Sequence, residues 1–394
     1  MISFSGPVPE NAHDEPSTGH MLLRLLGKAG LPVLAYACAV PASAQTLLVR
    51  PDNRAETLAI MFRLAGAVEY QRGRIQPYMH QIDSAFSPYA HEPAIEDIKR
   101  FRSLYGVGYD AVVSLAAHIT DPITFQERVP FDAPGCTLDP RWHGAAVRSL
   151  LTDARRFARD AHLAAFLRAE QPLYDSAAAR MRRMVEHSLN VAWFHRFYSD
   201  RSSSVFILSP LVSDADELFG PTFRDAHIME RHAYVGIGEQ DRGGYPVISP
   251  NYLPYIVHEF NHTFVNDVLD GHRDQFRPYA AQVFARVERQ MRAQHYLDPQ
   301  TMVDESVVRA TVIRYLMANA DAKAVNREIA MQRKLGFFWI EDLTRLLGRY
   351  QTHRAKYPTF RSFAPEIVRY YKRLSVQLSH TSSSERGTIN LIGF

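Results

Sequence analysis

Apolar residues recur at helical spacing along most of this chain. The recurrence predicts amphipathic helices on both sides of a short central region. The predicted helices comprise one that begins near Arg54, then Ala94–Tyr105, Asp110–His118, Gly144–Leu167, Leu173–His187, Pro278–Tyr296, Met302–Ala320, Asn326–Leu335, Ile340–Tyr350 and Phe363–Leu374. Many of the linkers between the predicted helices of the N-terminal half contain proline, as at Ser87-Pro88 and Asp121-Pro122. A predominantly helical protein is therefore expected.

Short runs rich in β-branched and aromatic residues interrupt the helical pattern. One is Thr46–Val49, and three more fall together at Val205–Leu208, Ala233–Ile237 and Pro246–Ile248. Glycine, proline and aspartate separate the three later runs, which is typical of short strands joined by turns. The expected fold class is therefore α+β, with a small sheet immediately before the next helix. No internal repeat, low-complexity block or clear linker divides residues 45–394, so one compact unit is expected.

The helix that follows contains the motif His-Glu-x-x-His. Ile256, Phe260 and Phe264 give it an apolar face, while His258 and His262 are spaced i, i+4 and so lie one turn apart on a neighbouring face. Two histidines with this spacing can bind one metal ion, and the glutamate between them can act as a general base. The motif therefore predicts a zinc site in which Glu259 is catalytic. The alternative is that both histidines are ordinary core residues and that Glu259 lies on a solvated face.

A catalytic zinc site needs a third protein ligand and one open position. The position six residues after His262 is Val268, so the compact three-histidine pattern is absent. Glu305 is the preferred third ligand because it shares a predicted helix face with Val308, Val312 and Leu316 and should point at the core. A buried carboxylate needs a cation or a metal, and Arg309 offers an ion pair as the alternative. The predicted start of that helix has Asp304 capping Thr301. The weaker rivals for the third ligand are His272, Asp267, Asp270, Asp274 and Glu288.

Other polar residues could complete this predicted site. Asn266 lies one turn after His262 and could orient that ligand. A hydrolase also needs a donor for the oxyanion; the candidates are Tyr315, Tyr234, His232, His195 and Arg309. The aromatic stretch Trp193–Tyr198 is interpreted as core packing.

Residues 1–44 are expected to be a leader rather than part of the fold. A basic segment after Met21 precedes an apolar run from Leu31 to Val40, and Ala42-Ser-Ala44 provides the small residues of a signal-peptidase site. We therefore expect translation to start at Met21, cleavage after Ala44, and export to the periplasm or the medium. The alternative, a lipoprotein with Cys38 modified, fits the preceding residues poorly. The apolar run is too short for a stable membrane span.

Charge and cysteine content narrow the range of partners. The formal net charge of +3 is too small to indicate binding to nucleic acid or to an anionic membrane. Only Cys136 follows the predicted cleavage site, so an internal disulfide in the mature chain is excluded. The expected partner is a peptide or protein substrate.

Four stretches carry a family resemblance: Asn251–Asn266, Phe62–Gly66, Gly108–Leu115 and Lys356–Phe360. Through them the chain resembles a family of exported bacterial proteins catalogued mainly as a domain of unknown function, whose zinc-peptidase character is inferred from the histidine motif. The pattern of two histidines and a distant glutamate is also similar to the gluzincin group of metallopeptidases. That resemblance implies His258, His262 and Glu305 as ligands of one Zn²⁺ and Glu259 as general base, on a zincin-like fold. Arg309 departs from the group, since many gluzincins carry an acid at that place.

Three functions are compatible with these expectations. The first is a zinc peptidase, with residues 45–200 as a helical N-terminal part, 201–277 as the sheet and motif helix, and 278–394 as the helical part that carries Glu305. The second is a zinc amidase that acts on a non-peptide or cell-wall substrate. The third is an exported binding protein without catalysis, which would have no need of Glu259.

Overall fold

A computed structural model describes residues 46–200, 202–214 and 218–389, which belong to one compact unit, Ser43–Phe394. The predicted leader, its start at Met21 and its cleavage after Ala44 lie outside the described residues. Among the described helices, none combines the length and the apolar character needed to cross a membrane.

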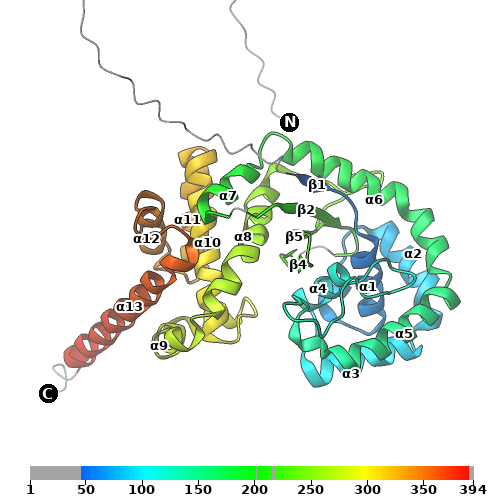
Figure 1. Ribbon diagram of the computed structural model, residues 1–394, viewed down its shortest axis with the longest axis horizontal. Coiled ribbons are helices and arrows are strands. Elements are labelled where there is room, and N and C mark those ends of the chain that lie inside the picture. Colours follow the sequence, from blue (N-terminus) through cyan, green and yellow to red (C-terminus); the bar gives the residue numbers. More distant parts are fainter. Residues whose placement is uncertain (1–45, 201, 215–217, 390–394) are drawn as a thin grey trace, which may run out of the picture. The chain divides into compact units, whose positions relative to one another are not determined.

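Helices dominate on both sides of a small sheet, as expected for an α+β protein (Figure 1). The N-terminal part contains β1 (Leu47–Val49), α1 (Asn53–Leu64), α2 (Gln76–Phe86), α3 (Pro93–Tyr105), α4 (Asp110–His118), α5 (Gly144–Asp160), α6 (Leu163–Val185) and α7 (Val191–Tyr198). The remaining strands are β2 (Ser204–Leu211), β3 (Leu218–Phe219), β4 (Thr222–Arg224) and β5 (Met229–Gly236). The C-terminal part contains α8 (Leu253–Asp270), α9 (Arg273–Arg292), α10 (Pro299–Asn319), α11 (Ala322–Lys334), α12 (Ile340–Thr352) and α13 (Phe360–Ile389). Short 3₁₀ turns lie at Val68–Gln71, Ser87–Tyr89, Pro140–Trp142 and Pro250–Tyr252.

The sheet has the order β1-β2-β5-β3, and β4 also pairs with β5. The strands β1, β2 and β5 run parallel, whereas β3 and β4 run antiparallel to β5 and form the edge. The predicted strand at Pro246–Ile248 is wrong, because Pro246 makes only an isolated bridge with Gln240. Proline cannot donate to a ladder, and the carbonyl oxygen of Pro246 instead accepts a hydrogen bond from Arg180.

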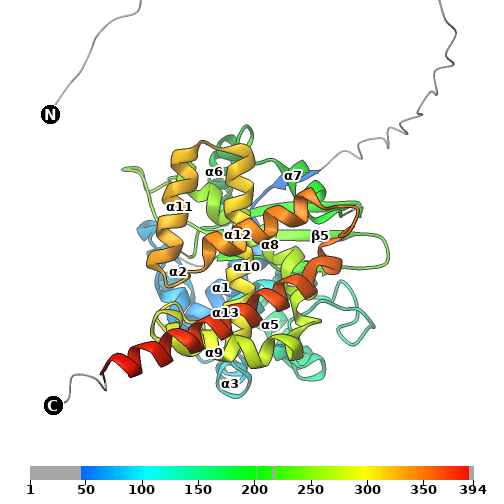
Figure 2. The same ribbon diagram turned by 90° about the vertical axis from the view of Figure 1, so that its left-hand side faces the viewer.

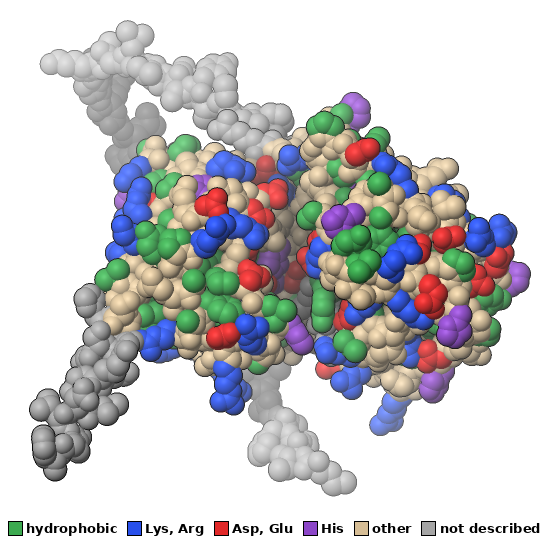
Figure 3. Space-filling model, turned by 90° about the horizontal axis from the view of Figure 1, so that it is seen from below, with side chains coloured by type: hydrophobic (Ala, Val, Ile, Leu, Met, Phe, Trp, Pro, Cys, Tyr) green, Lys and Arg blue, Asp and Glu red, His purple; other side chains and the backbone are tan. Residues whose placement is uncertain are grey.

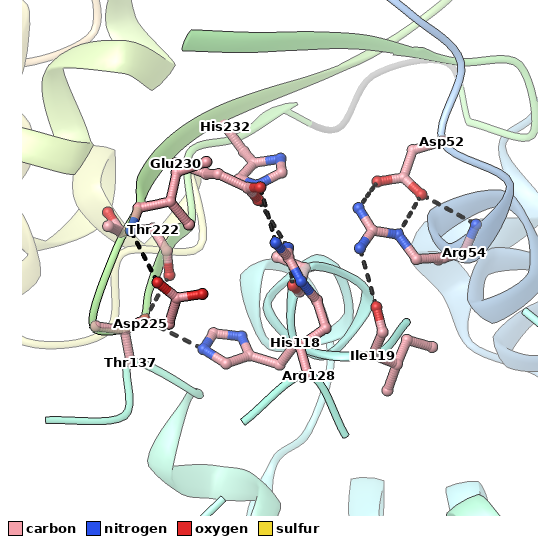
Figure 4. A network of polar contacts seen from close by, with 12 residues as sticks. Asp52, Arg54, His118, Ile119, Arg128, Thr137, Thr222, Asp225, Glu230 and His232 are labelled. Atoms are coloured by element: carbon pink, nitrogen blue, oxygen red, sulfur yellow. Dashed lines mark hydrogen bonds and ion pairs between the residues drawn. The ribbon is translucent and has the colours of Figure 1, made fainter. Parts of the chain in front are cut away.

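Successive residues of β5 point to opposite faces of the sheet, as strand geometry requires. On one face the Tyr234 hydroxyl donates to Asp52, which caps α1, and Glu230 pairs with Arg128. Figure 4 shows this buried network, in which charged groups from β5, the start of α1 and the segment after α4 meet. On the other face Arg231 donates to the carbonyl oxygen of Thr263 in α8. The sheet therefore separates α1 and α4 from α8.

An aromatic cluster fixes α8 against the sheet and α7. Phe206 of β2 packs edge-on against Phe260 with ring centroids 5.0 Å apart, and Tyr198 stacks on Phe264 at 4.3 Å. The Tyr198 hydroxyl also donates to the Asn261 side chain at 2.8 Å. The interpretation of Trp193–Tyr198 as core packing is confirmed, since Trp193 and the other aromatic rings of α7 are buried.

Helices α11, α12 and α13 cover the outer side of α10 and α8 (Figure 2). The predicted positions of α3, α4, α9, α10, α11 and α12 are confirmed within about five residues at each end. The predicted end of the last helix at Leu374 is wrong, because α13 continues to Ile389. Another boundary is wrong: the predicted helix Gly144–Leu167 is broken at Ala161–His162, where His162 takes a left-handed φ of 51°. The predicted gap before Leu173 is absent, because α6 continues through Pro172 with Leu167 and Tyr174 buried on either side. Burial on both sides outweighs the single hydrogen bond that the proline removes.

Candidate metal centre

The motif helix α8 presents both histidines to the same space. Pro254 lies in its first turn, and Ile256, Phe260 and Phe264 are buried as the apolar pattern predicts. His258 and His262 follow on the neighbouring face with their ring centroids 4.7 Å apart. Their Nε2 atoms approach to 3.0 Å, so the ring nitrogens of the two imidazoles converge on one point.

Glu305 reaches that point from α10, 43 residues further along the chain than His262. Its Oε2 atom lies 3.4 Å from Nε2 of His258, and its Oε1 atom lies 3.3 Å from Nε2 of His262. The predicted cap of α10 is wrong: Asp298 accepts from the backbone N–H groups of Gln300 and Thr301. Asp298 directly precedes Pro299, and proline favours the first helical position because its missing N–H needs no partner there.

The spacing of these three groups fits a zinc ion. Two ligand atoms about 2.0–2.1 Å from a tetrahedral zinc lie roughly 3.3 Å apart. The two Nε2 atoms lie 3.0 Å apart, and each lies 3.3–3.4 Å from the nearer oxygen of Glu305, which is Oε2 for His258 and Oε1 for His262. His258, His262 and Glu305 form the one group of three or more such side chains that the described residues bring within metal-binding distance. Two imidazoles and one carboxylate are also a donor set that zinc uses in catalytic sites.

Hydrogen bonds outside this cluster orient two of its members. Nδ1 of His262 lies 3.0 Å from Oδ1 of Asn266, to which it donates, so Nε2 is the ring nitrogen that faces the cluster. Glu305 accepts a hydrogen bond from Tyr296 and forms an ion pair with Arg309. Arg309 is therefore a partner of Glu305, as the alternative interpretation of the sequence proposed, while Glu305 also faces both histidines.

Burial and mutual charge set the protonation of the cluster. Burial raises the pKa of Glu259 to about 8 and lowers that of His258 to about 4. Burial would also lower the pKa of His262, but its hydrogen bond to Glu305 and the charge of that carboxylate raise it to about 10. Although burial opposes ionisation of Glu305, the two histidines hold its pKa well below the usual range. Glu305 is the anionic member of the group.

Glu259 differs from Glu305 in having no strong partner. It is 4 % exposed, and no hydrogen bond to its carboxylate is found among the described residues. The nearest ion-pairing contact is with His258, whose Nε2 lies 4.0 Å from Oε1 of Glu259. A buried carboxyl group of this kind is available for proton transfer.

The rival ligands have other partners or positions. The carboxylates of Asp270, Asp274 and Glu288 pair with arginines on neighbouring turns, and Nδ1 of His272 bonds to the carbonyl oxygen of Val268. Asp267 is exposed on α8. None of these five side chains joins the cluster of His258, His262 and Glu305 within the described residues.

The candidate oxyanion donors also lie elsewhere, except for one. Tyr315 donates to the carbonyl oxygen of Ser188, Tyr234 to Asp52, and His232 and His195 lie beside Glu230 and Asp200. Only Arg309 touches the cluster, through Glu305.

Two neighbours of the cluster were not predicted from the sequence. Tyr296 contacts Glu305, and Asp110 at the start of α4 lies close enough to Glu259 for its charge to raise the pKa of that group.

Tyr109, which precedes α4, contacts a residue beyond α9. It takes an unusual φ of 54°, and its ring centroid lies 6.3 Å from that of His295. The contact connects the N-terminal helices to the C-terminal ones. Figure 3 shows a hollow between these two sets of helices, with acidic and histidine side chains inside it.

The edge of the sheet lies directly on the motif helix. At Gly220, between β3 and β4, an added Cβ would come closer than 3.0 Å to the carbonyl oxygen of Glu259. One backbone group of this edge already has a hydrogen-bond partner, because the Thr137 hydroxyl donates to the carbonyl oxygen of Thr222 at 2.7 Å.

The fold and the site define a mostly helical α+β protein in which a cluster of two histidines and one glutamate lies beside the edge of a small sheet. The sequence profile of the family described as "Domain of unknown function (DUF4932)" matches residues 142–370. This range is more than half of the chain and includes the three clustered residues, and the chain belongs to this family. No curated protein and no solved structure matches the chain.

Proposed function

We propose that this protein is a zinc-dependent hydrolase, and that its substrate is a peptide or a protein. The observation that carries the proposal is the convergence of His258, His262 and Glu305 at the separations of a tetrahedral site. Beside them lies the buried Glu259, for whose carboxylate the described residues show only a 4.0 Å contact with Nε2 of His258. A cluster of core histidines would not require an additional buried carboxyl group without a hydrogen bond, because such a group is costly to bury.

Each residue has a role in this proposal. His258, His262 and Glu305 would hold one zinc ion, which supplies a Lewis acid for the substrate carbonyl and increases the acidity of water. Glu259 takes the proton from the attacking water and passes it to the leaving nitrogen. Asn266 holds His262 in the tautomer that directs Nε2 toward the cluster.

Two further features support a zincin-like arrangement. The edge strands β3 and β4 run antiparallel to β5 and lie against α8 at Glu259, where an extended substrate backbone could add to the sheet. In β4 the carbonyl oxygen of Thr222 already accepts a hydrogen bond from Thr137, which favours β3 for substrate pairing. The charge of Asp110 at the start of α4 acts on Glu259, so a substrate in the hollow would lie near both sets of helices.

The test is a digest of a peptide library by purified residues 45–394, with and without a chelator, together with a measurement of bound zinc. About one zinc per chain and chelator-sensitive cleavage are expected. Glu259→Gln should retain zinc and lose cleavage, while Glu288→Gln, which changes an exposed glutamate on α9, should behave as the unsubstituted protein. Zinc near zero in the unsubstituted protein would refute the proposal. Zinc binding without peptide cleavage would instead favour an amidase or a binding protein.

A further inference from the structure

The two oxygens of Glu305 have different surroundings. Oε2 accepts a hydrogen bond from the Tyr296 hydroxyl at 3.0 Å and lies 3.2 Å from Nε of Arg309. Oε1 has neither of these two partners. Each oxygen also faces one histidine: Oε1 lies 3.3 Å from Nε2 of His262, and Oε2 lies 3.4 Å from Nε2 of His258. A carboxylate oxygen that already interacts with a phenol and a guanidinium is a weaker donor to a metal than its free neighbour.

The Arg309 guanidinium cannot easily turn away from Glu305. One terminal nitrogen donates to the Tyr296 hydroxyl at 2.6 Å and the other donates to Oε1 of Gln332 at 2.8 Å. Gln332, on α11, is in turn bound to Glu328 at 2.6 Å. The Arg309 side chain is 12 % exposed, and its guanidinium lies 4.9 Å from the centroid of the Phe337 ring. Contacts from α11 and from the segment before α10 therefore fix the charge in place.

We propose that Tyr296 and Arg309 are positioning residues that make Glu305 a ligand through one oxygen, Oε1. The inference rests on the proposed binding of zinc and goes beyond it, since it sets how many ligand atoms the protein offers to the metal. With Oε2 engaged by protein, the chain supplies three ligand atoms and one position stays open for the reacting molecule. If Glu305 used both oxygens, it would take part of that space.

This arrangement explains why an arginine follows Glu305 at i+4. Asn266 orients His262 from within α8, so α10 does not need to supply a partner for that histidine. The position one turn after Glu305 can therefore act on Glu305 itself. The charge of Arg309 also offsets that of the ligand carboxylate, so the cluster without metal holds no uncompensated buried anion.

The test uses Tyr296→Phe, which removes one hydroxyl and keeps the ring. Zinc affinity is measured by competition with a chelator, and the coordination number is followed by the visible absorption of the cobalt-substituted protein. The intense absorption of four-coordinate cobalt should weaken in Tyr296→Phe as Oε2 becomes a second ligand atom. The Kd for zinc should rise about tenfold, the usual effect of losing a hydrogen bond to a ligand.

Two further variants separate positioning from a structural role. Arg309→Lys keeps the charge but loses the planar guanidinium group with its two donating terminal nitrogens. It should weaken the absorption of the cobalt-substituted protein, as Tyr296→Phe does. Tyr315→Phe removes a buried tyrosine hydroxyl of α10 that bonds to Ser188, and it should leave both the spectrum and the Kd unchanged. Thermal unfolding of each variant shows that it is folded.

The possible outcomes are distinguishable. A cobalt spectrum and zinc Kd in Tyr296→Phe equal to those of the unsubstituted protein would overturn the positioning role while leaving the proposed function intact. No binding of zinc or cobalt by the unsubstituted protein would overturn both. Metal binding without hydrolysis would refute the proposed reaction, and the spectrum would still decide the role of Tyr296.

Discussion

Asn266 bonds to the outer nitrogen of His262 at 3.0 Å, while the other ring nitrogen of that histidine faces Glu305. The orientation of the proposed ligand therefore depends on a side chain one turn away on the same helix. Asn266→Ala should weaken zinc binding about tenfold, because the imidazole loses the partner that fixes its tautomer and angle. The measurement is the zinc Kd. Asn319→Ala, at the end of α10, is the matched control and should not change it. An unaltered Kd in Asn266→Ala would show that the hydrogen bond has no orienting role.

Removal of metal should lower the stability of the protein. A metal ion present at 100 times its Kd stabilises the folded state by about 3 kcal/mol when the unfolded state does not bind it. Addition of a chelator should therefore lower the melting temperature of the unsubstituted protein but not that of His258→Ala, which has lost one ligand. His272→Ala is the control, because His272 lies outside the cluster and bonds to Val268. A chelator effect of equal size in His258→Ala would contradict the assignment of His258 as a ligand.

Gly220 allows the backbone of the sheet edge to approach the backbone of α8 at Glu259. Gly220→Ala should destabilise the protein by about 1–3 kcal/mol, since neither backbone can move aside without repacking. The rate of peptide cleavage should fall as well, because movement of the α8 backbone would displace Glu259. The measurements are the free energy of unfolding in urea and the rate of peptide cleavage. Gly144→Ala is the control: its added Cβ would lie 3.6 Å from that of Phe131, an ordinary contact.

Glu56 should make the stability of the fold depend on pH near neutrality. Its side chain is 1 % exposed and accepts from the backbone N–H of Val212 at 2.6 Å. Burial nevertheless raises its pKa to about 7 from the ordinary value of 4.5. Between these two values the folded state holds a proton that the unfolded state has released. The contribution of Glu56 is therefore fully present below about pH 4.5 and is lost as the pH rises through about 7, a loss of roughly 3 kcal/mol.

The measurement for Glu56 is the free energy of unfolding at several values between pH 5 and pH 7.5. Relative to Glu56→Gln, the unsubstituted protein should lose stability as the pH rises. The exposed Glu186→Gln should follow the unsubstituted protein. Parallel curves for Glu56→Gln and the unsubstituted protein would show that Glu56 is ionised at the same pH in both states.

The helices of this fold were largely predictable because their patterns are local. The helix Asp110–His118 is found at the predicted residues, and the helix Ile340–Thr352 begins where its pattern begins. The edge strands were not predictable, since β3 has two residues and exists only through pairing with Val235 and Tyr234. Such a strand is defined by its partner, which the local sequence does not indicate.

The same distinction applies to the site. Glu305 could be named from the sequence because Val308, Val312 and Leu316 share its helix face and direct it inward. Its approach to the histidines agrees with that reasoning, while its role as a metal ligand stays a prediction. Tyr296 and Asp110 could not be named, because their positions depend on how α9, α10 and α4 pack against α8. The sequence carries no periodic signal for contacts of this kind.

The contact between Gly220 and Glu259 uses only the backbone of the glutamate. Replacement of the Glu259 side chain should therefore leave the junction of sheet and helix in place, along with the hollow beside it. Under the proposed chemistry, the Glu259→Gln variant would act as a substrate trap. It would bind its physiological target without cleaving it, and the complex could be recovered from a cell extract.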